Sequence, residues 1–366
     1  MTRSIFFLLA ALLLSACDSN DAGTPIPDPT PPDSVVAGVN LNQLFSDPTG
    51  AERAAVQTLW STRNHQLPVS YNFTLEATLT GSDGAELKVY AGREPGSGGV
   101  FFYGLVRLPI RLPGDVRQRA TLLVLPDGDN GVSDGLISSG GLPFRSDIHE
   151  EFVYAMVAYR GETLRVGNQT FTPDAIQSAY DLETDDALAF VEHVYGSELL
   201  ADPNRVGVLG IGRGGGVALL AASRSSSFDL VIDIAGPANF FSESFKTKTR
   251  SILTNGVAGS FPGLQSLADQ VIFPLRDGSL SMADARVALL QRSPSHFVSP
   301  PPFIFVAHGI LDFVVHIDHS RSIGSIAGTP SALYLEVEEA GHTTILSDNE
   351  VVSLMTNFLV EHLIGS

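Results

Sequence analysis

Residues 205–220 read R-V-G-V-L-G-I-G-R-G-G-G-V-A-L-L, and this stretch decides the fold. Its first part, 206–209, is apolar and of strand length, and its last part, from Val217, has the composition of a buried helix. Glycines crowd the turn between the two parts, which lets strand and helix approach closely. The stretch therefore predicts a strand, a sharp turn and a helix.

The same alternation extends on both sides of this stretch. Apolar runs that predict strands occupy 121–125, 152–158, 206–209, 230–234, 303–307 and 333–337, and helical patterns occupy 172–195, 217–222, 283–290 and 351–363. Continuous apolar strands that alternate with helices favour a doubly wound, mostly parallel α/β sheet covered on both faces. The segment from about 237 to 299 has helical patterns and no clear strand, which predicts a helical cap insertion.

Residues 35–112 predict a small N-terminal α+β extension. A capping box at Thr49 and Glu52 begins one short helix, and 71–91 alternates like a hairpin around a turn at 81–84. A further strand is expected over 100–108. The predicted organisation is thus 1–16, 17–34, 35–112 and 113–366, the last being the main α/β domain.

The N-terminus has the pattern of an export signal. Arg3 precedes an apolar run over 5–14, which is too short to span a bilayer but suits a signal peptide. Leu14-Ser15-Ala16-Cys17 resembles a bacterial lipobox, in which the cysteine is lipidated, and Cys17 is the only cysteine of the chain. Proline-rich residues after Cys17, up to 34, predict a spacer. We expect an envelope protein, lipid-anchored on the periplasmic or cell-surface side; a plain secretory signal is the alternative.

Composition and charge exclude some functions. The 366 residues are 44% hydrophobic and 17% charged, which is typical of a globular protein. With 22 basic and 40 acidic residues, the formal net charge of -18 makes nucleic acid an improbable partner.

The turn at 210–214 resembles the G-x-S-x-G turn that carries the nucleophile in α/β-hydrolases, with Gly212 at the serine position. Further along, His308-Gly309-Ile310-Leu311-Asp312 follows an apolar strand, and His342 follows the next one. Nucleophile, acid and histidine in this order resemble the prolyl oligopeptidase-like (dienelactone hydrolase-like) family of serine hydrolases. The resemblance implies Asp312 as the acid, His342 as the base and Gly212 as a degenerate nucleophile position.

Further motifs extend this resemblance over 120–366. Tyr159-Arg160-Gly161 and Ser293-Pro294 are similar to family elements, and the family's oxyanion donors would correspond to the Arg213 backbone and the turn at Pro126 and Asp127. Proline has no N–H to donate, and Asp127 would place negative charge where an oxyanion must bind. The Arg213 side chain is expected to be packed under the cap, with a cationic pocket lining as the alternative.

Two cofactor interpretations were weighed against this one. Gly210, Gly212 and Gly215 have the spacing of a dinucleotide motif, but no acidic residue follows at a fitting distance apart from a weak match at Asp233. His316, Asp318 and His319 lack further metal ligands at a convincing spacing. We therefore expect no cofactor and no metal.

Three functions follow from these motifs. The preferred one is an envelope-anchored pseudo-hydrolase that binds a small ester, amide or peptide-like ligand, or a partner, without turnover. The second is a weak esterase or peptidase in which His342 activates a water. The third is a structural lipoprotein that displays its 237–299 insertion. A serine restored at position 212 is expected to face His342.

Overall fold

The computed structural model describes residues 34–365, apart from 94, 97, 129–130, 139–140, 257–258, 298–302 and 325–330 and the side chains of 68 and 69. The expected signal peptide, Cys17 and nearly all of the spacer lie outside the described residues. Val35–Ser366 forms one compact unit. No described helix combines the length and apolar character that crossing a bilayer requires.

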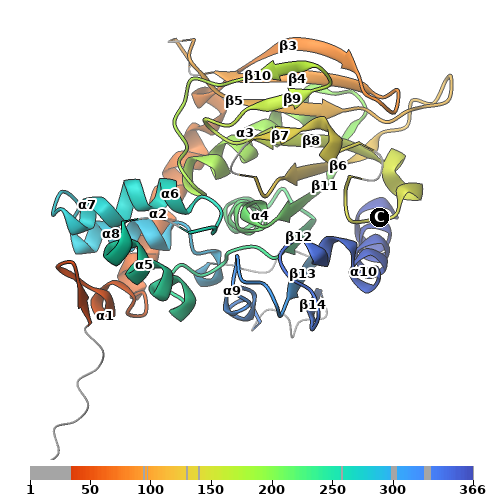
Figure 1. Ribbon diagram of the computed structural model, residues 1–366. Coiled ribbons are helices and arrows are strands. Elements are labelled where there is room, and N and C mark those ends of the chain that lie inside the picture. The colour runs from red at the N-terminus through yellow and green to blue at the C-terminus, as the bar shows by residue number, and fades with distance from the viewer. Residues whose placement is uncertain are drawn as a thin grey trace, which may run out of the picture. The chain divides into compact units, whose positions relative to one another are not determined.

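A nine-stranded sheet forms the centre of this unit (Figure 1). In spatial order its strands are β14 (Ala332–Val337), β13 (Phe303–Gly309), β12 (Leu230–Ile234), β11 (Ala201–Ile211), β6 (Arg119–Leu125), β8 (Phe152–Ala158), β5 (Val100–Arg107), β4 (Glu86–Arg93) and β3 (Asn72–Thr80). Pairings from β14 to β8 are parallel, and those from β8 to β3 are antiparallel. The expected mostly parallel sheet is confirmed.

Burial on both faces explains why the parallel strands are continuous apolar runs. Along β8, Val153, Ala155 and Val157 join one core cluster, whereas Tyr154 and Met156 join the other. The first cluster includes buried side chains of three helices, α2 (Gly50–Ser70), α3 (Asp181–Ser197) and α4 (Arg213–Arg224). The second contains α10 (Asn349–Leu359), which a π-helical turn, Val360–Ile364, extends. The sheet is therefore wound on both sides.

Helices fill the described part of the segment between β12 and β13. They are α5 (Glu243–Asn255), α6 (Leu264–Leu267), a π turn (Ala268–Ile272), α7 (Phe273–Arg276), α8 (Met282–Leu290) and a 3-10 turn (Pro294–His296). Figure 1 shows them grouped beside α2. Phe240, Phe245 and Phe261 are fully or almost fully buried and join the core cluster that contains α4.

Residues 72–107 do not form a separate sheet. Their hairpin strands β3 and β4 pair with β5, and β5 pairs with β8, so the extension completes the central sheet. The predicted capping box is present, with Thr49 Oγ1 accepting from the Glu52 N–H at 3.2 Å. The helix that it begins, α2, has 21 residues and is longer than the short helix expected.

The predicted start of the helix over 172–195 is wrong. Residues 169–171 form β10 (Gln169–Phe171), and α3 begins only at Asp181. Tyr180, the residue before it, has φ +72°, and its N–H donates to Glu183 at 2.8 Å. A left-handed residue cannot continue a helix, so the proline and aspartate at 173–174 mark a loop instead.

Short elements complete the chain. They are β1 (Val35–Val36), β2 (Val39–Asn40), α1 (Leu41–Leu44), β7 (Val132–Ser133), β9 (Leu164–Val166), α9 (Asp318–Arg321) and the 3-10 turns Asp134–Leu136, Ser146–Glu151 and Thr344–Ser347. Strands β10, β9 and β7 form a small second sheet.

Close approach of α4 to β6 predicts a sharp difference between two glycines. A Cβ on Gly214 would lie 1.9 Å from the Leu125 carbonyl oxygen, whereas a Cβ on Gly196, near the end of α3, would contact nothing within 4 Å. We expect Gly214→Ala to lower the free energy of unfolding by about 1 to 3 kcal/mol or more. Gly196→Ala should raise it by about 0.4 to 1 kcal/mol. Urea unfolding of both variants tests this, and equal midpoints would contradict the helix placement.

Candidate active site

Gly212 occupies the sharp turn between β11 and α4. Its φ of +51° and ψ of -118° form a backbone conformation that favours glycine, and it immediately precedes the first residue of α4. The Gly212 N–H donates to the Ile234 carbonyl at 2.8 Å, which ties the turn to the neighbouring strand β12. The turn lies at the carboxyl end of β11, the edge of a parallel sheet where ligands commonly bind.

Asp312 and His342 follow β13 and β14 and meet at the same edge. The Asp312 Oδ2 accepts from His342 Nδ1 at 2.7 Å, and its Oδ1 accepts from the backbone N–H groups of Val314 and Val315 at 2.8 and 2.9 Å. These bonds fix both the carboxylate and the tautomer of the imidazole, so that His342 Nε2 is left to face the turn. Asp312 is 1% exposed.

A second histidine, His308, also contacts Asp312. Its Nε2 lies 3.3 Å from the Asp312 Oδ2 and 2.9 Å from the Val315 carbonyl, and its Nδ1 hydrogen-bonds Ser320 Oγ. Burial disfavours the charged form of Asp312, but the hydrogen bonds from His308 and His342 lower the pKa of Asp312 well below its usual range. The sequence motif contained His308, but nothing in its spacing indicated this contact.

Asp127 fills the space beside Gly212. Its Oδ1 accepts from the Arg213 backbone N–H at 2.9 Å, and its Oδ2 lies 3.1 Å from His342 Nε2. A Cβ placed on Gly212 would lie 1.8 Å from Asp127 Oδ1 and 2.3 Å from its Cγ. A serine side chain at 212 would compete with the Asp127 carboxylate for this volume, so Asp127 would have to turn away before the serine could face His342.

Two carboxylates favour the protonated form of His342. Burial by itself would lower the pKa of His342, but hydrogen bonds and charges of Asp127 and Asp312 outweigh it and raise the pKa to about 9. An imidazolium has no lone pair with which to accept a proton. The raised pKa therefore disfavours general-base action by His342 at neutral pH.

The Arg213 side chain points into the protein instead of lining a pocket. Its guanidinium bonds Glu162 at 2.6 Å and also Glu183, and it lies 4.6 Å from the Tyr159 ring centre. Its Nη1 also donates to the Gly128 carbonyl at 3.4 Å. Arg213 therefore helps to hold the loop that carries Asp127.

Pro126 is held from the opposite side. Its carbonyl accepts from the Tyr159 hydroxyl at 2.9 Å, and a proline offers no N–H to a developing oxyanion. Of the predicted oxyanion groups, Pro126 therefore contributes no N–H, and the Arg213 N–H is already engaged by the Asp127 carboxylate.

Other residues singled out in the sequence make contacts within the fold. Asp318 accepts from Ser244, His319 Nδ1 accepts from the Asn239 N–H at 3.1 Å, and Ser293 Oγ accepts from the Phe240 N–H at 3.0 Å. Within the part of the chain that the structure describes, no three histidine, cysteine or acidic side chains are arranged to hold a metal ion.

Comparison with known proteins gives the name of the fold. No protein-family model and no curated protein matches the chain in sequence. It is similar in structure to acetyl xylan esterase 1 from Thermoanaerobacterium sp. JW/SL YS485, with a TM-score of 0.60 and 14% identity over 88% of this chain and 100% of that one. The acetyl xylan esterase from Paenibacillus sp. R4 gives 0.56 and 14% over 88% and 99%. Both are α/β-hydrolases, and this chain has the α/β-hydrolase fold.

The raised pKa of His342 predicts a pH-dependent stability. The folded chain holds this proton more tightly than an unfolded histidine of pKa 6.5, so the stabilisation is complete below pH 6.5 and is lost as the pH rises through about 9. Asp127→Asn should lower the pKa of His342 in an NMR titration and flatten this dependence in urea unfolding. Asp147→Asn, at an exposed ion pair with Arg145, is the control and should leave the pKa unchanged.

Proposed function

We propose that this chain is a pseudo-hydrolase: an envelope lipoprotein, anchored through Cys17, that uses a hydrolase fold to bind an ester, amide or peptide-like ligand or a partner without hydrolysing it. The observation that carries the proposal is the Asp127 carboxylate, which contacts both His342 Nε2 and the Arg213 N–H beside Gly212. The finer resemblance to the prolyl oligopeptidase family rests on positions 212, 312 and 342 in that order.

Acyl transfer requires a nucleophile, a base and an oxyanion donor; Gly212 affects the first of these, and Asp127 the other two. Gly212 has no oxygen to attack a carbonyl, so no acyl-enzyme can form there. The base is held as a cation by the same carboxylate, and the backbone donor is already occupied by a negative charge. A substrate carbonyl would have to displace Asp127 before it could approach any of these groups.

Hydrolysis by a His342-activated water is the competing function. It requires a neutral imidazole, which the pKa of about 9 places in the alkaline range. Ester turnover that rises through pH 9 and disappears in His342→Ala would support it. A ligand-dependent rise in melting temperature without turnover supports the pseudo-hydrolase instead. Acetylated xylo-oligosaccharides belong in the ligand panel because the similar structures are named acetyl xylan esterases.

A serine-directed fluorophosphonate should not label the purified chain, and Gly212→Ser alone should not restore labelling. The new Cβ would meet Asp127 Oδ1 at 1.8 Å, and φ at this position is +51°. Gly212→Ser combined with Asp127→Gly frees both the volume and His342, so we expect slow labelling, which intact-mass spectrometry measures. Because Pro126 supplies no second oxyanion donor, the rate should be about 10² to 10³ below that of ordinary serine hydrolases.

Asp127→Gly alone serves as the control for this pair and should remain unlabelled. Stoichiometric labelling of the unmodified chain at any serine would overturn the proposal. Equal labelling of the single and double variants would contradict the occupancy of the site by Asp127.

Cys17→Ala should abolish lipid attachment. The thiol is the proposed acceptor, and the chain contains one cysteine. Metabolic palmitate labelling and membrane fractionation measure the effect, with Ser15→Ala as a nearby control that keeps the cysteine. Persistent labelling of Cys17→Ala would remove the lipoprotein assignment and leave the binding proposal standing.

A further inference from the structure

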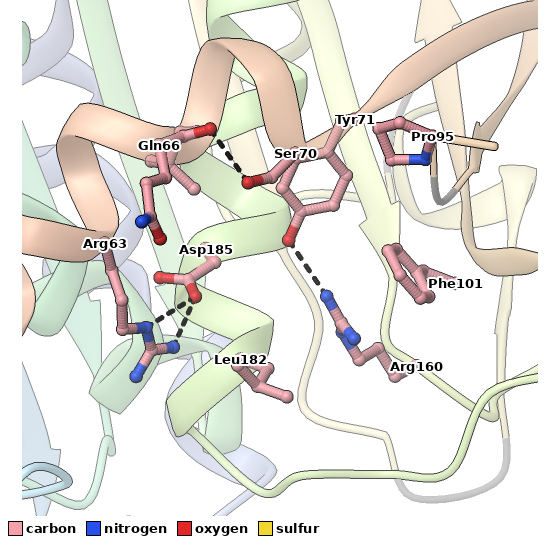
Figure 2. A pocket seen from close by; sticks show the side chains of 10 residues that line it. Arg63, Gln66, Ser70, Tyr71, Pro95, Phe101, Arg160, Leu182 and Asp185 are labelled. Atoms are coloured by element: carbon pink, nitrogen blue, oxygen red, sulfur yellow. Dashed lines mark hydrogen bonds and ion pairs between the residues drawn. The ribbon is translucent and has the colours of Figure 1, made fainter. Parts of the chain in front are cut away.

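A cavity of about 460 Å³ lies outside the candidate active site (Figure 2). Arg63 and Gln66 from the C-terminal half of α2 form one wall together with Tyr71, which directly follows this helix, and the start of α3 contributes Leu182. Arg160, which follows β8, and Phe101 of β5 form the opposite wall. The cavity is therefore built from four separate segments of the fold and is lined by both charged and apolar groups.

The charged groups around this cavity are paired, and the pairing of Arg160 does not use one of its nitrogens. Arg160 directs Nε and Nη2 to the two oxygens of Asp186, both at 2.7 Å, and Nη2 also donates to the Tyr71 hydroxyl at 2.9 Å. Among the described residues, no hydrogen bond reaches Arg160 Nη1, and this nitrogen is not among the atoms sealed from solvent. The Arg160 side chain is otherwise 91% buried, with 9% exposed. A fixed cation therefore offers one free N–H edge.

The second guanidinium is paired at every nitrogen. Arg63 donates from Nε and Nη2 to Asp185 and from Nη1 to Asp181, and Asp185 also accepts from Arg224. The unpaired nitrogen on which the binding argument rests is therefore Arg160 Nη1. As an N–H donor, it calls for a ligand that brings an acceptor.

Apolar surface lies next to these donors. The Phe101 ring centre is 4.3 Å from the Arg160 guanidinium carbon, and Leu182 is 36% exposed. Leu67 also lines the cavity and is buried, whereas Pro95 is exposed. A bare inorganic anion would leave this surface wet, whereas an apolar group would cover it.

We propose that this cavity binds an organic carboxylate whose apolar body packs on Phe101 and Leu182 while its oxygens accept from Arg160 Nη1 and the Gln66 amide. A carboxylate matches the planar guanidinium, and a charge-assisted hydrogen bond favours it over a neutral amide of the same shape. This ligand site is separate from the function proposed above and does not require position 212 to be inactive.

Isothermal titration of the full chain in detergent with 4-phenylbutyrate, 4-phenylbutyramide and inorganic phosphate tests the proposal. We expect the carboxylate to bind at least about tenfold more tightly than the amide or phosphate. Equal affinity of carboxylate and amide, equal affinity of carboxylate and phosphate, or no binding of the carboxylate would each overturn the assignment.

Variants locate the binding without disturbing the buried pairs. Gln66→Glu places a negative charge at the exposed rim and should weaken binding of the carboxylate by about two- to fivefold. Gln57→Glu is the matched control, since Gln57 is exposed on the same helix but lines a different depression, and its affinity should not change. An equal loss in both variants would mean that binding responds only to total charge, and would refute this site.

Discussion

The buried guanidinium of Arg213 is the contact on which the centre of this molecule depends. It is the first residue of α4, and it reaches Glu162 after β8 and Glu183 in α3. A buried ion pair is costly to desolvate, so losing one partner would leave an uncompensated charge and a large penalty. The same guanidinium donates to Gly128, which places the loop after β6 against the turn at Gly212. Turn, helix and loop are therefore positioned together.

The segment 159–162 extends this coupling in two directions. Tyr159 bonds the Pro126 carbonyl, and Glu162 pairs with Arg213, so both side chains support the candidate active site. Arg160, between them, points into the other cavity and pairs with Asp186. Neighbouring residues of one short turn thus contact both the candidate active site and the cavity beside α2, so the two sites share this turn.

The strong periodic signals of the sequence predicted the fold well. Six apolar runs became the parallel strands. Five of them are buried on both faces, which requires apolar residues on each, and the sixth, β14, is half-buried at the edge of the sheet. The order of Gly212, Asp312 and His342 indicated which strand ends would meet, since parallel strands present their carboxyl ends at one edge. Helix boundaries that depend on the conformation of a single residue were harder to predict. Helix α3 begins only after Tyr180, which is left-handed, and no local sequence pattern indicates this conformation.

Sequence reasoning placed Asp127 near the site but could not give the direction of its side chain. That direction depends on Tyr159, Arg213 and His342, which come from three distant segments. The unpaired Nη1 of Arg160 could not be predicted from the sequence either, because it depends on which N–H groups Asp186 and Tyr71 leave unused. Long-range donor and acceptor matching is not encoded in spacing along the chain.

The shared volume of Asp127 and position 212 also constrains how this chain can change over evolutionary time. Glycine and serine codons can differ by one base, so a single mutation can change Gly212 to serine. With Asp127 in its present position, however, the Cβ of the new side chain would lie 1.8 Å from Asp127 Oδ1, so the carboxylate would have to move before the change could bring any activity. Loss of Asp127 first would free His342 but still leave no nucleophile. Under the function proposed above, serine chemistry at this site would therefore require substitutions at both positions.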